Sequence, residues 1–400
     1  MPTRRTVLTL AGGGAAALLA VPAGPAAATT GRAAVTGPRT VRLTAPTGPR
    51  RVATRAVHLI DRQRTDPFAP VPAPRELMVQ LWYAVGSVGG CPDAPYTSAR
   101  VAAAVEAGLG LPAGLVGRLR GHAVSGAPGG GAGGGVGGGG VGGQPSGPLV
   151  LFSPGRTGIR AGATALAEEL ASRGFVVAAV DHTHDAAAVE FPDGRLVTGN
   201  LPAEPEDWDA QDRKEVAVRA ADLRFVADRL ARLLPGTAGR PVGVFGHSLG
   251  GAAAAEALRQ DRRFAAGLDL DGGLFGSTVP AVGLDRPFLL LTSLADHETW
   301  QLFRDHHRSW GRQLRITGGG HLTATDIPHL AVPGRLAEVW DGPTYEALLG
   351  PIAPQRGTEL VRAYTGAFFE RFLLGRPGGL LDAPSGRYPE VIHQWSRNGG

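Results

Sequence analysis

Short apolar runs alternate with longer segments of mixed polarity along most of the chain. Strand-like runs separated by stretches long enough for a helix are typical of β-α units, in which successive strands lie parallel. The alternation therefore predicts an α/β fold with a mostly parallel central sheet and helices on both of its faces. The strand-like runs of this part of the chain are 148–153, 175–180, 242–245, 266–271, 287–292 and 313–317.

Two earlier strand-like runs, 55–60 and 77–83, predict an antiparallel edge of the same sheet. A separate N-terminal domain is the less favoured alternative. Because 43% of the 400 residues are hydrophobic, the chain can bury one sizeable core. We expect residues 29–125 to supply the N-terminal strands and edge of one domain, and residues 148–400 to form its core.

The segment 209–234 has the apolar spacing of a long helix. One face is apolar, and charged residues surround it, so these charges are expected to lie on a solvated face. The apolar positions are Val216, Ala220, Leu223, Ala227, Leu230 and Leu234, and the charged ones are Arg219, Asp222, Arg229 and Arg232.

The chain contains the pattern Gly-X-Ser-X-Gly at 246–250, between the apolar run 242–245 and an Ala-rich segment. A strand, a sharp turn and a helix in this order hold the serine in a strained backbone that exposes its hydroxyl, and the glycines permit the close approach of strand and helix. The pattern predicts Ser248 as a nucleophile. A serine hydroxyl needs a neighbouring imidazole and a carboxylate that orients this imidazole.

Candidates for both partners follow Ser248 in the order that α/β-hydrolases use. His321 comes after the run 313–317 and three glycines, which would form a loop able to deliver its ring. Two carboxylates, Asp271 and Asp296, follow apolar runs where parallel strands would end, and spacing alone does not choose between them. Asp269 lies inside its strand and is expected to be salt-bridged or to cap a turn.

The segment 148–182, together with the serine turn, resembles the secreted platelet-activating factor acetylhydrolases of the α/β-hydrolase superfamily. The resemblance extends over about 148–326 and includes Asp261-Arg-Arg-Phe264 before Leu270-Asp271. A weaker similarity is found at 75–83. That family has its triad acid at the position of Asp271, which is therefore favoured over Asp296. The resemblance also implies an oxyanion hole built from the backbone N–H groups of Leu249 and Arg156.

This sequence departs from the family at the second oxyanion turn, where it reads Ser153-Pro154-Gly155-Arg156 instead of Ser-His-Gly-Leu. Pro154 has no N–H, and Arg156 brings a cation to a position where the family has an apolar side chain. The backbone donor of Arg156 survives both changes. The pocket mouth is expected to be more polar than in relatives.

The resemblance implies a serine esterase that hydrolyses short-acyl esters, including acetylated or oxidised phospholipids, through an acyl-enzyme and without cofactor or metal. A lipase or cutinase-like polyesterase with the same triad, and a catalytically silent hydrolase fold that binds ligands, remain alternatives. The basic residues form no run with interleaved aromatics, so nucleic-acid binding is not indicated. His182, His184 and Asp185 lack the spacing of a zinc site and are expected around the substrate or behind the site. A monomer with at most peripheral membrane contact is favoured.

Residues 1–28 have the pattern of an export signal: Arg4 and Arg5, a weakly apolar stretch, and small residues before a cleavage point. The arginine pair resembles a twin-arginine signal, while ordinary secretion remains open. Its removal lowers the formal charge from +5 to +3. One cysteine, Cys91, excludes an internal disulfide. In 126–143, 13 of 18 residues are glycine, which predicts a disordered insertion over 126–147.

Overall fold

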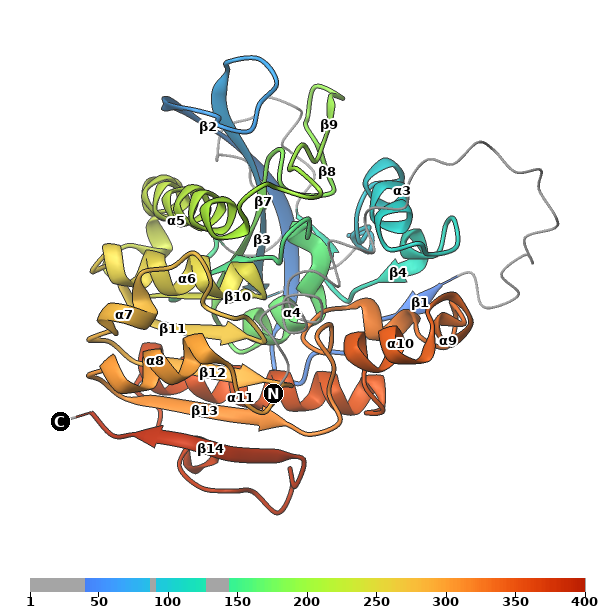
Figure 1. Cartoon of the computed structure of the whole chain (residues 1–400). Coiled ribbons are helices and arrows are strands. Elements are labelled where there is room, and N and C mark those ends of the chain that lie inside the picture. Colours follow the sequence, from blue (N-terminus) through green and yellow to red (C-terminus); the bar gives the residue numbers. More distant parts are fainter. Residues whose placement is uncertain (1–39, 87–90, 127–143, 400) are drawn as a thin grey trace.

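The computed structural model describes residues 40–86, 91–126 and 144–399. Within these residues, ten strands form one sheet that crosses the whole molecule (Figure 1). The export signal expected at 1–28 and most of the glycine-rich insertion lie outside the described residues. From one edge to the other, the strands are β14 (Val391–Arg397), β13 (Gly311–Ile316), β12 (Phe288–Thr292), β11 (Phe264–Leu270), β10 (Val242–His247), β6 (Leu149–Ser153), β7 (Val176–His182), β3 (Pro74–Val85), β2 (Arg51–Thr65) and β5 (Val124–Ser125).

The centre of the sheet, from β13 to β7, is parallel, and the strands that flank it, β14 and β3, run antiparallel to it. At the far edge, the short strand β5 pairs parallel with β2. β3 runs antiparallel to β7, with Leu77 opposite His182, and β2 pairs antiparallel with β3. The predicted α/β-hydrolase architecture with an N-terminal antiparallel edge is therefore confirmed. The opposite edge, β14 against β13, was not predicted, because the sequence of β14 mixes apolar and polar residues and has no long apolar run.

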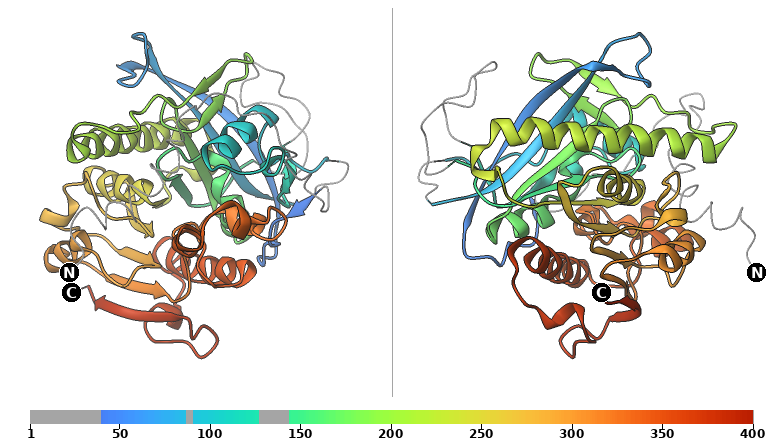
Figure 2. Two further views of the ribbon diagram at one scale, coloured as in Figure 1. Left: turned by 45° about the vertical axis from the view of Figure 1, so that its right-hand side comes forward. Right: turned by 90° about the vertical axis from the view of Figure 1, so that its left-hand side faces the viewer.

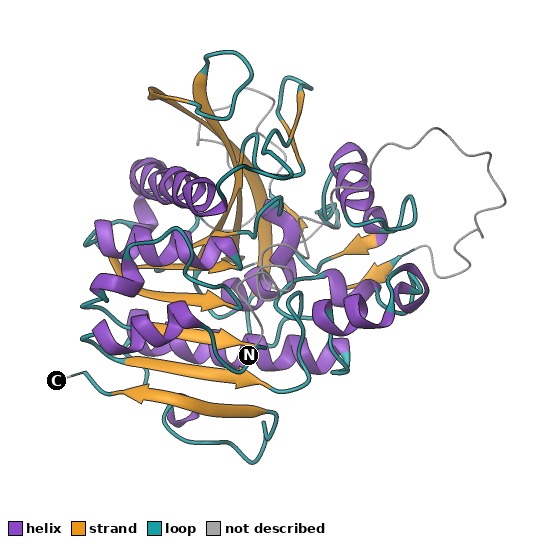
Figure 3. Ribbon diagram, viewed as in Figure 1, coloured by secondary structure: helices purple, strands orange, loops and turns teal. Residues whose placement is uncertain are grey.

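Helices cover both faces of the sheet (Figures 2 and 3). One buried cluster joins the sheet to α5 and α6, and a second joins its other face to α4 and α11. Strands buried on both faces explain the almost continuous apolar runs of the sequence. The helices are α4 (Thr164–Ser172), α5 (Trp208–Leu233), α6 (Leu249–Gln260), α7 (Val279–Val282), α8 (Glu298–His306) and α11 (Pro354–Leu374).

Helix α5 lies where the spacing predicted it, but its charges do not all face solvent. Asp207 caps its N-terminus by accepting the N–H of Ala210. Arg219 and Asp222 are fully buried against the sheet, so the expectation of a solvated face was wrong for these two residues. Helical spacing identifies which residues share a face, yet it does not reveal acidic and basic partners on other elements.

A third buried cluster lies beyond the carboxyl ends of the parallel strands, at the right of Figure 1. It combines apolar residues from the N-terminal segment with residues that follow β13. No helix among the described residues is long and apolar enough to cross a membrane. The elements in this region are β1 (Val41–Arg42), α3 (Ala99–Gly108), β4 (Leu119–Arg120), α9 (Leu336–Val339) and α10 (Gly342–Leu348), and a small hairpin consists of β8 (Ala188–Glu190) and β9 (Leu196–Thr198).

Candidate active site

Ser248 occupies a sharp turn between β10 and α6. Its φ and ψ angles are +54° and −129°, a conformation that non-glycine residues rarely adopt. A Cβ atom on Gly246 would lie 2.0 Å from the carbonyl oxygen of Gly250, and one on Gly250 would lie 2.0 Å from that of Ser153. Both glycines are therefore sterically required. The turn presents Ser248 at the carboxyl edge of the sheet.

Asp271 follows the last residue of the neighbouring strand β11 and faces His321. His321 Nδ1 lies 2.9 Å from Asp271 Oδ2. The other carboxylate oxygen accepts the N–H of Ser293 at 2.6 Å and its hydroxyl at 2.8 Å. Asp271 also has a positive φ, +54°. Three hydrogen bonds thus fix this carboxylate in one orientation against the imidazole.

The environment of Asp271 favours its charged form. Burial alone would raise the pKa of this carboxyl group, but the hydrogen bond and charge of His321 and the two bonds from Ser293 hold the pKa below its ordinary value. The carboxylate is therefore ionised at neutral pH. An ionised acceptor at Nδ1 keeps the proton on that nitrogen and directs Nε2 outward as a base.

The loop after β13 delivers His321, as the three glycines predicted. A Cβ atom on Gly320 would lie 2.5 Å from backbone atoms of Leu348 and Leu349, so the loop packs closely against the end of α10. The N–H of His321 donates to the carbonyl oxygen of Ala347 at 2.9 Å. The loop is thereby anchored on both sides of the ring.

His247, the residue before Ser248, contacts His321 directly. The two ring centroids are 4.8 Å apart, and His247 Nε2 donates to the carbonyl oxygen of His321 at 2.7 Å. This contact joins the histidine loop to the serine turn. Among the described residues, no hydrogen bond joins Ser248 Oγ to His321 itself, and such bonds are often long before a substrate binds.

Burial, followed by the charge of His321, lowers the pKa of His247 to about 4. His247 is therefore neutral at pH 7. The sequence analysis missed this residue because the central pattern leaves its position unspecified. Its signal, a histidine directly before the serine, is too common to identify a role.

The alternative acid, Asp296, has other partners. Its carboxylate pairs with Arg304 of α8 at 2.8 Å and accepts the side-chain amide of Gln301 at 2.9 Å. Its side chain is 40% exposed. The geometry therefore brings Asp271, and not Asp296, to His321. Asp269 caps a turn by accepting the N–H of Gly272 at 3.0 Å.

The two expected oxyanion donors come from the two segments next to Ser248. Leu249 is the first residue of α6, and Arg156 belongs to the turn after β6. A Cβ atom on Gly155 would lie 3.3 Å from the Cβ of Ser248, so this turn contacts the serine. Within the described chain, neither the N–H of Leu249 nor that of Arg156 has an acceptor. Both groups are available to bind a developing oxyanion.

The guanidinium of Arg156 is not a free cation at the site. It pairs with Asp212 and with Glu215, the latter at 2.8 Å, and lies 5.1 Å from the ring centroid of Trp208. All three partners belong to the first turns of α5. The expected extra charge at the pocket mouth is therefore neutralised, and a partly exposed aromatic ring lies beside the turn.

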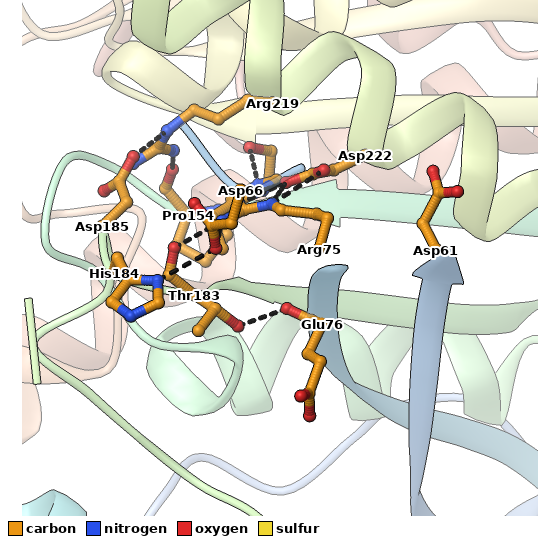
Figure 4. Close-up of polar contacts among 12 residues, drawn as sticks. Asp61, Asp66, Arg75, Glu76, Pro154, Thr183, His184, Asp185, Arg219 and Asp222 are labelled. Atoms are coloured by element: carbon orange, nitrogen blue, oxygen red, sulfur yellow. Dashed lines mark hydrogen bonds and ion pairs between the residues drawn. The ribbon is translucent and has the colours of Figure 1, made fainter. Parts of the chain in front are cut away.

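His182, His184 and Asp185 belong to a network of ion pairs and hydrogen bonds. Figure 4 shows His184 beside Asp66 and Asp185 paired with Arg219. His182 lies between Ser153 and Asp222, at 2.9 Å from each, and Asp222 pairs with Arg75. In the described part of the chain, no group of three or more histidine, cysteine or acidic side chains could hold a metal ion. Sequence reasoning missed Arg75, because nothing in a strand-like run marks a buried cation.

Comparison with known proteins supports the class that the fold and site define. A family model described as platelet-activating factor acetylhydrolase, isoform II, matches residues 142–194. A probable 1-alkyl-2-acetylglycerophosphocholine esterase from Arthroderma benhamiae is 31% identical over 61% of this chain and 65% of that protein. The platelet-activating factor acetylhydrolase of Cavia porcellus is 31% identical over 32% of this chain and 35% of that protein. The chain thus spans less than two thirds of the length of these curated relatives.

A solved structure extends the similarity to nearly the whole chain. The ferulic acid esterase from Streptomyces cinnamoneus is 38% identical, with a TM-score of 0.77, over 88% of this chain and 99% of that one. Fold, site and relatives define an α/β hydrolase of the carboxylic ester hydrolase class. Within that class, the chain belongs to the family of this ferulic acid esterase, and part of it is similar to the platelet-activating factor acetylhydrolases.

Proposed function

We propose that the protein is a serine esterase in which Ser248 is the nucleophile, His321 the base and Asp271 the orienting acid. The observation that carries this proposal is the 2.9 Å contact between His321 Nδ1 and Asp271 at the edge where the strained turn exposes Ser248. His321 Nε2 takes the proton of Ser248 Oγ as this oxygen attacks the ester carbonyl. The proton passes to the leaving alcohol, and an acyl-enzyme forms.

Water then releases the acyl group, with His321 again acting as base and then as acid. Negative charge develops on the carbonyl oxygen in both steps, and backbone N–H groups aimed at it lower the barrier. We assign this role to Leu249 and Arg156. The absence of any acceptor for either N–H within the described chain supports the assignment.

We propose short-acyl esters, including acetylated phospholipids, as the substrate class, because the named relatives include an acetylglycerophosphocholine esterase. A second candidate is the ester of an aromatic acid. Two observations favour it: the similarity to a ferulic acid esterase over nearly its whole length, and the partly exposed Trp208 beside the oxyanion turn. Stacking on such a ring would hold an aromatic acyl group.

One ester series tests the proposed function. We expect kcat/KM to be higher for acetyl and butyryl than for palmitoyl esters of one leaving group, each kept below its micelle threshold. Methyl ferulate in the same series measures the second candidate. Ser248→Ala is the control and should lose at least about 10⁴-fold in kcat while remaining folded.

A profile that rises steadily towards sixteen carbons would favour a lipase. A folded protein that turns over no ester would favour a binding protein with a silent hydrolase fold.

We also propose that the protein is exported and that residues 1–28 are removed, on the sequence pattern of that segment.

A further inference from the structure

The backbone of the turn that carries the Arg156 N–H makes few hydrogen bonds within itself. It follows β6, and its one internal backbone bond joins the N–H of Gly158 to the carbonyl oxygen of Gly155 at 2.9 Å. Thr157 has a positive φ of +60°, an unfavourable conformation for a β-branched residue. A turn with this backbone needs external contacts to keep a single geometry.

Arg219 supplies these contacts from α5 (Figure 4). Its guanidinium donates to the carbonyl oxygen of Pro154 at 2.5 Å and to that of Gly155 at 3.1 Å. The same group binds Asp185, with Nε 2.6 Å from Oδ2. Asp185 in turn accepts the N–H of Thr157 at 3.2 Å. Arg219 therefore fixes the turn on both sides of Arg156.

The charge of Arg219 is fully buried, with 1% of its side chain exposed. Burying a cation is costly unless it is paired, and Asp185, also 1% exposed, is the pairing carboxylate. The charge of Arg219 in turn holds the pKa of Asp185 below its ordinary value, against the effect of burial. An apolar residue on the sheet-facing side of α5 would pack without this cost. The arrangement instead aims a rigid planar donor at two carbonyl oxygens.

A separate set of contacts holds the start of the turn. Ser153 Oγ lies 2.9 Å from His182 Nε2, and His182 Nδ1 lies 2.9 Å from Asp222. Arg75 pairs with Asp222 at 2.6 Å and donates to the carbonyl oxygen of Thr183. These groups fix the end of β6, whereas Arg219 fixes the residues that follow it.

We propose that Arg219 is a positioning residue for the oxyanion hole, which keeps the Arg156 N–H directed at the carbonyl oxygen of the substrate. This inference rests on the proposed function. Since the donor must be in place before the charge develops, a turn that fluctuates would weaken transition-state binding more than substrate binding. Arg219 touches no substrate and acts only through the backbone of residues 154–157.

The test compares Arg219→Met and Arg219→Lys with Arg362→Met as the matched control. Arg362 of α11 is also buried, and it also donates to backbone carbonyl oxygens, those of Thr44, Ala45 and Ala165, but on the opposite face of the sheet. Melting temperature, kcat and KM for p-nitrophenyl acetate are measured for each variant. Inhibition by a trifluoromethyl ketone, whose hydrate resembles the tetrahedral intermediate, is measured in parallel.

We expect Arg219→Met to lower kcat by roughly 10- to 100-fold, with KM within a few-fold and inhibitor affinity reduced in step with kcat. Arg219→Lys should fall between this variant and the wild type, because one ammonium group cannot bind both carbonyl oxygens and Asp185. Arg362→Met should lower the melting temperature to a similar extent and leave kcat of the folded fraction unchanged.

Equal kcat values for wild type, Arg219→Met and Arg219→Lys would overturn the inference, as would a loss that Arg362→Met reproduces. If Arg219→Met does not fold, Asp185→Asn replaces it, since this change removes the charge that pairs with Arg219 and keeps the size of the side chain. An unchanged kcat there and in Arg219→Lys would also overturn the inference. Activity retained by Ser248→Ala would instead refute the proposed function.

Discussion

Two aspartates of one strand end, Asp269 and Asp271, have opposite electrostatic environments. Asp271 has three hydrogen-bond donors and a pKa held below its ordinary value. For Asp269, burial first and the charge of Asp271 second raise the pKa well above the ordinary value. The environment of the first side chain favours the carboxylate form, and that of the second disfavours it.

This difference predicts that Asp271→Asn lowers kcat by roughly 10³- to 10⁴-fold, because an amide at this position favours the wrong imidazole tautomer. Asp269→Asn should change kcat by no more than a few-fold, since Asp269 binds the N–H of Gly272 and not His321, and the amide oxygen of Asn can still accept that N–H. Steady-state kinetics on p-nitrophenyl acetate at pH 7.5 compares the two variants. Similar losses in both would show that the charge of Asp271 is not what matters.

At the scale of elements, Glu256 ties α6, the helix after Ser248, to the start of α7. One of its carboxylate oxygens accepts the N–H and the hydroxyl of Thr278, each at 3.0 Å, and the other accepts Arg259 at 2.6 Å. Burial alone would raise the pKa of Glu256, but these hydrogen bonds lower it to about 2. A carboxylate whose pKa is lower in the folded than in the unfolded state stabilises the folded state at any pH above the unfolded pKa. This stabilisation is lost as the pH falls through the folded pKa.

Glu256→Gln should therefore lower the free energy of unfolding by on the order of 2 to 3 kcal/mol at pH 7. The difference from the wild type should shrink as the pH falls from about 4.5 towards 2, where the wild-type carboxylate becomes protonated. Urea unfolding at pH 7, 5 and 3 measures this trend. A difference that stays constant with pH would mean that packing, and not the charge, carries the contribution.

The apolar runs predicted the strands at the centre of the sheet, and one glycine pattern predicted the turn of Ser248. The choice of Asp271 over Asp296 came from the family resemblance and not from these patterns. The runs 242–245 and 266–271 correspond to β10 and β11, and Ser248 and Asp271 follow them, because parallel strands bring their carboxyl ends to one edge. The buried charges of α5 could not be predicted. The partners of Arg219 and Asp222 come from other elements, and a single sequence contains no record of such contacts.

At the scale of the whole molecule, the N-terminal segment connects parts of the chain that lie far apart in sequence. Val41 and Leu43 are buried in the cluster that also contains apolar residues from the range 330–349. Thr47 donates its N–H and its hydroxyl to Glu169 of α4, at 2.7 and 2.6 Å. These contacts thus lie well after the predicted export signal.

Removal of residues 1–28 should leave the melting temperature of the purified protein unchanged, whereas removal of residues 1–50 should lower it by several degrees. The second truncation exposes the apolar partners of Val41 and Leu43 and leaves Glu169 without two of its donors. Thermal unfolding of both truncated proteins is the measurement. Equal melting temperatures would show that this segment contributes nothing to stability.

The central claim is that Ser248 is the nucleophile, and the fold itself provides a competing serine. Ser153 also lies beside an imidazole and a carboxylate, those of His182 and Asp222, but it is fully buried. The most direct measurement is the reaction of the folded protein with a fluorophosphonate, followed by proteolysis and mass spectrometry of the labelled peptide. We predict one adduct, on Ser248, and none in Ser248→Ala. An adduct on Ser153, or no adduct on the folded wild type, would contradict the proposed mechanism.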